Sequence, residues 1–126
     1  MKIHVEITRA VLLARGAVSE AGSVGAAVEF AGIVRGEEDG AAIAALDYEA
    51  YEEMARSEME RIPRDLAGQF PCESIEVIHR IGRVAVGETS ILVRIEAKHR
   101  AEAFGMLGEF MNRMKRDVPI WKRVSS

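Results

Sequence analysis

The chain has 126 residues, of which 48% are hydrophobic and 29% are charged, and its formal net charge is −3. This length and composition predict a single globular domain over residues 1–126 that folds without disulfides or metal, and the charge excludes a generally basic nucleic-acid-binding protein. No stretch free of charged residues exceeds eight, which excludes a membrane-spanning helix, and the apolar run at residues 10–14 is too short for a signal peptide. We therefore expect a cytoplasmic protein.

The first half of the chain predicts three strands, one short helix and one turn. Apolar residues that alternate or run together indicate strands at residues 3–7, 25–35 and 43–50. The segment 11–21 favours a short helix, and the segment 36–40, rich in glycine and acidic residues, favours a turn. The second strand is expected to place three apolar side chains on one face: Val28, Phe30 and Val34.

The second half predicts two longer helices and two strands. Residues 51–68 have a helical pattern in which Pro63 is expected to kink or split the helix. Strands follow at 74–81 and 89–97, and the clearest helix spans 99–117. The side chains expected to face inward are Met54, Met59, Ile62 and Leu66 in the first helix, and Ala103, Leu107, Phe110 and Met114 in the second. This order of elements implies an α+β fold whose helices pack against a mostly antiparallel or mixed sheet.

Charge is distributed unevenly along the chain. Residues 37–60 carry a net charge of −8, which is typical of a solvated face, whereas residues 98–123 carry +4 and bracket an apolar helix and a tryptophan. A local positive region in an acidic protein favours a small anionic ligand over a polyanion. The cationic candidates are Arg35, His99, Arg100, Lys115 and Lys122.

His99 and Arg100 open the second long helix, where free backbone N–H groups and the helix dipole favour phosphate. The alternative is that His99 takes the place of a helix cap and Arg100 is an ordinary surface residue.

The sequence lacks the patterns of several common catalytic classes. Cys72 is the only cysteine and has no basic cluster near it in sequence to activate it, so we interpret it as structural. The histidines His4, His79 and His99 lack the spacing of metal ligands. No phosphate-loop, serine-hydrolase or metalloprotease motif is present. We expect neither a metal nor a cofactor.

Five segments occur in an order that identifies a family. They are FAGIVRG at 30–36, LDYEAYEEMA at 46–55, IHRIGRVAVGE at 78–88, KHRAEAF at 98–104 and MKRDVPIWK at 114–122. Together they resemble the catalytic large subunit of molybdopterin synthase, and the resemblance covers nearly the whole chain from Gly25 onward.

The resemblance implies an α/β hammerhead-type fold and a homodimer. It also implies a heterotetramer, in which each large subunit binds a small ubiquitin-like sulfur carrier whose C-terminal Gly-Gly carries a thiocarboxylate. The implied reaction of this sulfurtransferase belongs to molybdenum cofactor biosynthesis, and it inserts two sulfurs into cyclic pyranopterin monophosphate to make the dithiolene of molybdopterin. The single unactivated cysteine fits this chemistry, because sulfur would then arrive on the partner.

The matching motifs also imply site residues. They make Lys115 and Lys122 catalytic, and they imply a pterin-binding set of Ile33, Val34, Arg35, His99, Arg100, Lys115, Lys122, Arg123 and Val124. We expect the two lysines to converge on one pocket, because Lys115 lies in the last helical turn and Lys122 on the extended segment after Pro119. His99 and Lys115 are separated by about 24 Å along one helix, so a site that uses both requires two chains.

The sequence departs from the family pattern in three places. The acidic residues 37–39 follow Arg35 in place of a loop rich in Asn and His, Val124 stands where an acidic residue is frequent, and the sequence stops at Ser126 without the longer tail common in the family. These departures favour an alternative in which the chain is a non-catalytic paralogue that acts as a dimeric binding or scaffold subunit. A third possibility is an unrelated anion-binding module, against which the five ordered motifs count.

Overall fold

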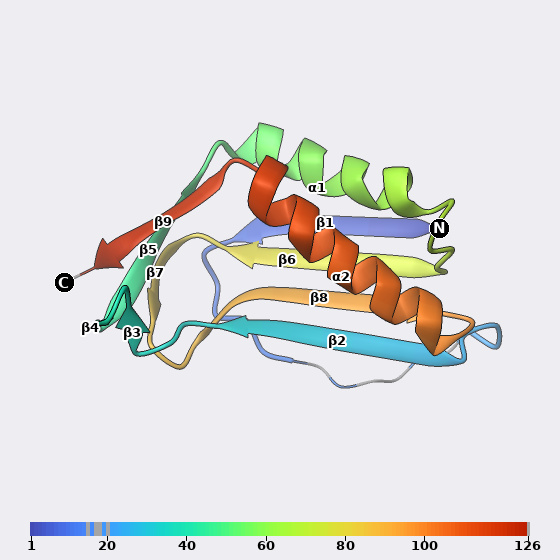
Figure 1. Cartoon of the computed structure of the whole chain (residues 1–126), viewed down its shortest axis with the longest axis horizontal. Helices are drawn as coiled ribbons and strands as arrows, with labels where there is room; N and C mark the ends of the chain where they lie inside the picture. Colours follow the sequence, from blue (N-terminus) through green and yellow to red (C-terminus); the bar gives the residue numbers. More distant parts are fainter. Residues whose placement is uncertain (15, 17–18, 20, 126) are drawn as a thin grey trace.

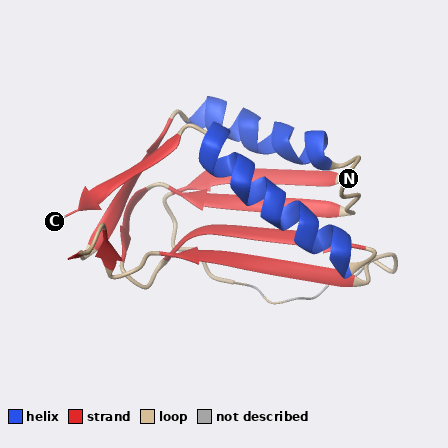
Figure 2. Ribbon diagram, viewed as in Figure 1, coloured by secondary structure: helices blue, strands red, loops and turns tan. Residues whose placement is uncertain are grey.

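In the computed structural model, two α-helices cross one face of a four-stranded sheet, and a smaller sheet extends from one end of this layer (Figures 1 and 2). The structure describes residues 1–14, 16, 19 and 21–125. The helices are α1 (Glu52–Leu66) and α2 (Arg100–Asp117). The strands are β1 (Lys2–Thr8), β2 (Ala26–Ile33), β3 (Glu37–Glu38), β4 (Ala41–Ala42), β5 (Ala45–Ala50), β6 (Ser74–Arg80), β7 (Gly82–Ala85), β8 (Thr89–Ala97) and β9 (Ile120–Ser125).

The larger sheet has the strand order β1-β6-β8-β2. β1 runs parallel to β6, and the other neighbours are antiparallel. Buried residues alternate along β6, so Ile75, Val77 and His79 share the face that the helices cover. The main core lies between this face and the helices, and its fully buried side chains include Met59, Ile62, Met106 and Phe110.

α2 ends where the sequence forbids a further helical turn. The backbone of Val118 is extended because this residue precedes Pro119, and its N–H donates to the carbonyl of Met114 at 3.1 Å. The chain then enters β9 directly, so Lys115 in the last turn of α2 and Lys122 on β9 flank one corner of the molecule.

The smaller sheet has the strand order β7-β5-β9 and a core of its own, formed by Val34, Leu46 and Val84. β9 pairs antiparallel with β5, and this register places Lys122 opposite Tyr48. The short β3–β4 hairpin lies beside this sheet (Figure 1). Its turn uses left-handed backbone at Asp39 and Gly40, which agrees with the turn predicted over 36–40.

The predicted α+β fold with a mixed sheet packed against helices is confirmed. The strands predicted at 3–7, 25–35, 43–50, 74–81 and 89–97 and both long helices are present, and no boundary is shifted by more than two residues. The strands β3, β4 and β7 were not predicted, whereas the extended segment predicted after Pro119 is present as β9. No helix in the described part of the chain is long and apolar enough to cross a membrane.

The helix predicted over 11–21 is wrong for every described residue of that segment. Residues 11–14, 16, 19 and 21 are not helical, and residues 15, 17, 18 and 20 lie outside the described residues. Gly16 has φ +83°, which a right-handed helix does not allow. Leu12 is buried whereas Val11 and Leu13 are exposed, so this segment lacks the apolar face on which a short helix depends.

Two details of the predicted packing are wrong, and one of the two outcomes predicted for Pro63, a split helix, is not found. Met54 is 59% exposed, because the inward face of α1 is formed one residue later, from Ala55 onward. α1 is not split at Pro63, which is buried near the C-terminal end of the helix and removes only one hydrogen bond there. Val34 does not share a face with Val28 and Phe30, since the register shift at Gly32/Ile33 directs it into the smaller core.

Candidate functional site

A pocket of about 430 Å³ lies where the C-terminal end of α2 meets β9, β5 and the ends of β2, β6 and β8. Its walls are mostly apolar, and its polar side chains are Tyr48, His79, Ser90, Lys115 and Lys122. The apolar lining comes from Phe30, Ile33, Ile91, Met111, Met114, Val118, Ile120 and Trp121, with Gly32.

The two lysines reach this pocket from different elements. Lys115 extends from the last turn of α2, and among the described residues it makes no ion pair. Lys122 extends from β9, and its Nζ lies 3.4 Å from Oε1 of Glu38 on the β3–β4 hairpin. The predicted convergence of the two lysines on one pocket is thus present in the geometry, and a single chain supplies both cations.

Trp121, the residue before Lys122, also lines the pocket and makes an edge-to-face contact with Tyr51 at the start of α1. Their ring centroids are 5.1 Å apart. This contact fixes the β9 segment that carries Lys122 against the start of α1.

His79 is a polar group that the sequence interpretation did not include in the site. It is only 5% exposed, and its Nδ1 lies 2.8 Å from the carbonyl oxygen of Arg80. Its ring meets Tyr48 edge-on, with centroids 5.3 Å apart. Burial lowers the pKa of His79, and the hydrogen bond to Arg80 offsets part of that effect. The alternation of Ile75, Val77 and His79 along β6 was the signal that could have placed this histidine on the inner face.

The three predicted site residues at the end of β2, Ile33, Val34 and Arg35, lie in different surroundings. Ile33 is exposed and lines the pocket with the lysines, whereas Val34 is buried in the smaller core. Arg35 lines a separate, open hollow beside the β3–β4 hairpin, together with Gly36, Glu37, Asp39 and Gly40.

The remaining predicted residues lie away from the pocket within one chain. His99 is the N-cap of α2, without a side-chain capping bond, and Arg100 is the first helical residue; both are exposed. They are at the opposite end of α2 from Lys115 (Figure 1). On β9, Arg123 forms an ion pair with Glu49, and Val124 is exposed.

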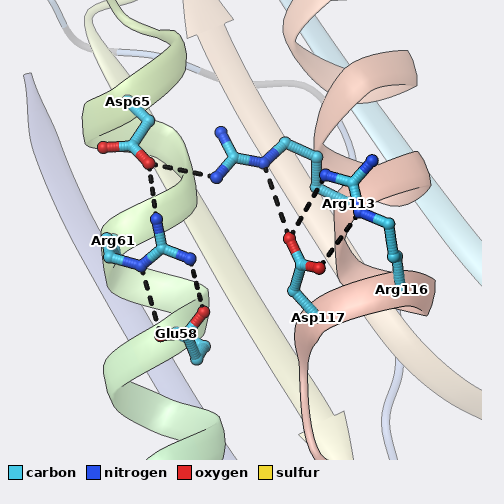
Figure 3. Close-up of polar contacts among 6 residues, drawn as sticks. All are labelled: Glu58, Arg61, Asp65, Arg113, Arg116 and Asp117. Carbon is cyan, nitrogen blue, oxygen red and sulfur yellow. Dashed lines mark hydrogen bonds and ion pairs between the residues drawn. The ribbon is translucent and has the colours of Figure 1, made fainter.

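An ion-pair network joins α1 to the end of α2 that carries Lys115 (Figure 3). Arg113 of α2 lies 3.0 Å from Asp65 of α1, and the same carboxylate lies 2.6 Å from Arg61. Arg61 also binds Glu58, and Asp117 binds Arg116. Single exposed pairs contribute little to stability, but a shared carboxylate restricts how the two helices can slide past each other.

Cys72 does not belong to this site. It is half-buried, and its Sγ lies 3.7 Å from the carbonyl oxygen of Glu102. Burial, together with the nearby Glu102 carboxylate, raises the pKa of Cys72 to about 11, so the thiol is protonated at neutral pH. Among the described residues, no group of three or more His, Cys, Asp or Glu side chains is placed to hold a metal ion.

The sequence and the fold both match proteins of one family. Residues 5–117 match the family described as MoaE protein. The molybdopterin synthase catalytic subunit of Pyrococcus abyssi is 45% identical over 107 residues, which cover 85% of this chain and 72% of that protein.

Two solved structures have the same fold. The molybdopterin synthase structure from Staphylococcus aureus superposes with a TM-score of 0.79 at 30% identity, and the match covers 83% of this chain and 77% of that one. A complex of subunits 1 and 2 of the molybdopterin-converting factor from Helicobacter pylori contains a chain that matches with a TM-score of 0.68 at 28% identity, covering 81% of this chain and 66% of that one. Because the family match covers residues 5–117 and the relative from Pyrococcus abyssi is 45% identical over 85% of this chain, the chain belongs to the MoaE protein family.

Proposed function

We propose that this chain is the catalytic subunit of a molybdopterin synthase, a sulfurtransferase that converts cyclic pyranopterin monophosphate into molybdopterin. Membership of the MoaE family and 45% identity to a protein named for this role support the proposal. The observation that carries it is the pocket in which Lys115 and Lys122 meet between apolar walls.

The chemistry of this pocket suits sulfur transfer from an acyl group to a phosphorylated pterin. When a nucleophile attacks the acyl carbon, negative charge develops on its oxygen, and an ammonium group in a partly desolvated pocket stabilises that charge. A second ammonium group can hold the substrate phosphate or protonate a leaving oxygen. The protonated Cys72 lies elsewhere, which supports the delivery of sulfur by a partner.

That partner is a small sulfur-carrier subunit with a C-terminal Gly-Gly thiocarboxylate. The fold match to a chain of a two-subunit complex supports a small-subunit partner. Its tail would enter the pocket as an extended segment, because glycine lets a backbone pass between walls that leave no room for side chains. We also propose that the protein acts in the cytoplasm as a homodimer, in which His99 and Arg100 of one chain complete the pterin site of the other.

The alternative, a binding subunit that has lost catalysis, has one observation in its favour. Glu38 pairs with Lys122 and partly neutralises one of the two proposed catalytic cations. Lys115 has no such partner among the described residues, which is why we favour the enzyme.

The test is incubation of the chain with a thiocarboxylated small subunit and the pterin precursor, with the dithiolene product measured directly. We expect product from the wild-type chain, and a loss of about 10²-fold or more in turnover for Lys115→Ala, the usual scale for a lost acid–base group. Lys115→Arg should rescue little, because guanidinium keeps its proton and differs in shape.

The matched control is Lys2→Ala, which removes an exposed lysine at the start of β1, outside the pocket. This variant should turn over at the wild-type rate. Wild-type protein that binds the small subunit but makes no product would favour the scaffold alternative. Near-normal turnover in both Lys115 variants would remove this lysine from the mechanism.

A further inference from the structure

His79 is a buried residue in the lining of the pocket. It lies on β6, between β1 and β8, where its backbone is paired with Ile7 on one side and Ile91 on the other. Its ring follows Ile75 and Val77 on the inner face of the sheet and lines the same pocket as Lys115 and Lys122. A ring held in this way keeps one orientation toward whatever the pocket binds.

The hydrogen bond of this ring fixes its tautomer. A backbone carbonyl only accepts hydrogen bonds, so the 2.8 Å contact with Arg80 requires that Nδ1 carries the proton and donates it. Nε2 then holds an unshared electron pair. Among the described residues, Nε2 has no hydrogen-bond partner, and burial favours the neutral ring.

No other side chain of the pocket offers the same chemistry. Lys115 and Lys122 are hydrogen-bond donors when charged, and the Ser90 hydroxyl donates to the carbonyl of Gly32 at 3.2 Å. The Tyr48 side chain is a phenol, whose oxygen is a far weaker base than an imidazole nitrogen. Among the described lining residues, His79 is therefore the neutral nitrogen base.

We propose that Nε2 of His79 is the general base that activates the water needed to release sulfur from the partner's tail. The inference rests on the proposed function. When one sulfur joins the acyl carbon of the tail to the pterin, the linkage is a thioester. Release of the pterin-bound sulfur from the tail requires water to replace that sulfur on the acyl carbon. Water attacks, a C–O bond forms and the C–S bond breaks, with no change in oxidation state. The proton of the water passes to Nε2 and then to the departing sulfur, so the ring is neutral again and the tail ends as a carboxylic acid.

Two variants separate this role from a purely structural one. His79→Asn can keep the hydrogen bond to the Arg80 carbonyl through its amide N–H but has no group at the position of Nε2. His79→Gln can place an amide oxygen near that position, which accepts a hydrogen bond but not a proton. For a general base, both variants should lose about 10²-fold or more in turnover.

The specific readout is the small subunit's mass after a single turnover with the pterin precursor. We expect the covalent tail–pterin adduct to accumulate in both variants and to be short-lived with wild-type protein. Near-normal turnover of His79→Asn would show that the histidine is structural. Near-normal turnover of His79→Gln together with a loss of turnover in His79→Asn would show that His79 only orients the water through a hydrogen bond and does not accept its proton. Wild-type protein that makes no product would contradict the proposed function instead.

A second measurement does not depend on activity or on a variant that folds. The nitrogen NMR spectrum of histidine-labelled wild-type protein should show one ring protonated at Nδ1 and unprotonated at Nε2 at neutral pH. A ring for His79 that carries its proton on Nε2, or on both nitrogens, would overturn the inference.

Discussion

Glu38 changes the charge at one of the two lysines of the proposed site, because it forms an ion pair with Lys122. The acidic residues Glu37, Glu38 and Asp39 follow Arg35 in the sequence, where their carboxylates would oppose an anion bound to that arginine. In the structure, Glu38 points to Lys122, whereas Glu37 and Asp39 line the open hollow with Arg35. An anionic substrate that binds Lys122 therefore competes with Glu38.

Glu38→Gln should strengthen substrate binding by removing this competition. A partly exposed pair contributes about 0.2–1 kcal/mol, so we expect KM for the pterin phosphate to fall by about 1.4- to fivefold. The difference from wild type should shrink as salt is added. Glu37→Gln is the control, because it removes the same charge from the neighbouring position without a contact to Lys122. Equal effects of both variants on KM would indicate a general charge effect.

The burial of His79 also makes stability depend on pH. Burial lowers the pKa of His79 in the folded chain, so the unfolded chain takes up this proton first as the pH falls. The free energy of unfolding should therefore decrease below about pH 6.5, by at most about 1.4 kcal/mol per pH unit. The charged and titratable side chains in the same pocket are Tyr48, Lys115 and Lys122.

Urea unfolding at several pH values between 5.5 and 7.5 measures this effect. We expect the wild-type chain to lose more stability than His79→Gln between pH 6.5 and 5.5. Parallel curves for the two proteins would show that His79 is not responsible.

At the scale of elements, the sequence predicted the helices and strands whose apolar residues repeat with a regular local period. Long helices and alternating strands were found because each carries a continuous apolar face. β7 was missed because four residues, Gly82–Ala85, hold too little pattern, and their strand conformation depends on pairing with β5. The helix predicted at 11–21 failed because a short helix depends on tertiary packing for most of its stability.

The same reason explains which parts of the site were predictable. Lys115 and Lys122 are close in sequence, and the proline between them fixes the direction of the chain, so their convergence followed from local geometry. His79 comes from a strand in the middle of the chain, and its place beside the lysines follows from the sheet order β1-β6-β8-β2. The order of the strands in a sheet cannot be read from a local sequence pattern.

Two glycines of α2 allow a matched test of helix packing. A Cβ on Gly105 would lie 2.3 Å from the ring of Phe70, whereas one on Gly108 would have no atom within 4 Å. Gly105→Ala should destabilise the fold by about 1–3 kcal/mol through overpacking. Gly108→Ala should stabilise it by about 0.5–1 kcal/mol, because alanine is the better helix former. Thermal unfolding of both variants provides the measurement, and equal shifts in Tm would contradict the contact with Phe70.

At the scale of the whole molecule, α2 separates two groups of cations. His99 and Arg100 lie at one end and Lys115 at the other, a helix length of about 24 Å apart. If the pterin site uses both ends, as the family resemblance implies, it must combine two chains. Chains with Arg100→Ala should then complement chains with Lys115→Ala.

The measurement is dithiolene formation by confirmed mixed dimers of these two inactive chains. In each mixed dimer, one of the two sites has both intact halves, so we expect about half of the wild-type activity. Mixed dimers that remain inactive would show that the two groups do not share a site.

The parallel pairing of β1 with β6 has a consequence for how the chain folds. β1 precedes the other described strands along the chain, but its partner in the sheet, β6, lies more than half of the chain away. Strands β2, β6 and β8 can pair among themselves before β1 joins them. Until it does, the edge of β6 that carries the backbone of His79 remains open to other chains, and such edges are sites of aggregation. The pairing of β1 with β6 is a slow, long-range step, and the chain is most exposed to aggregation before it is complete. A chaperone should therefore protect the chain most at this stage of folding.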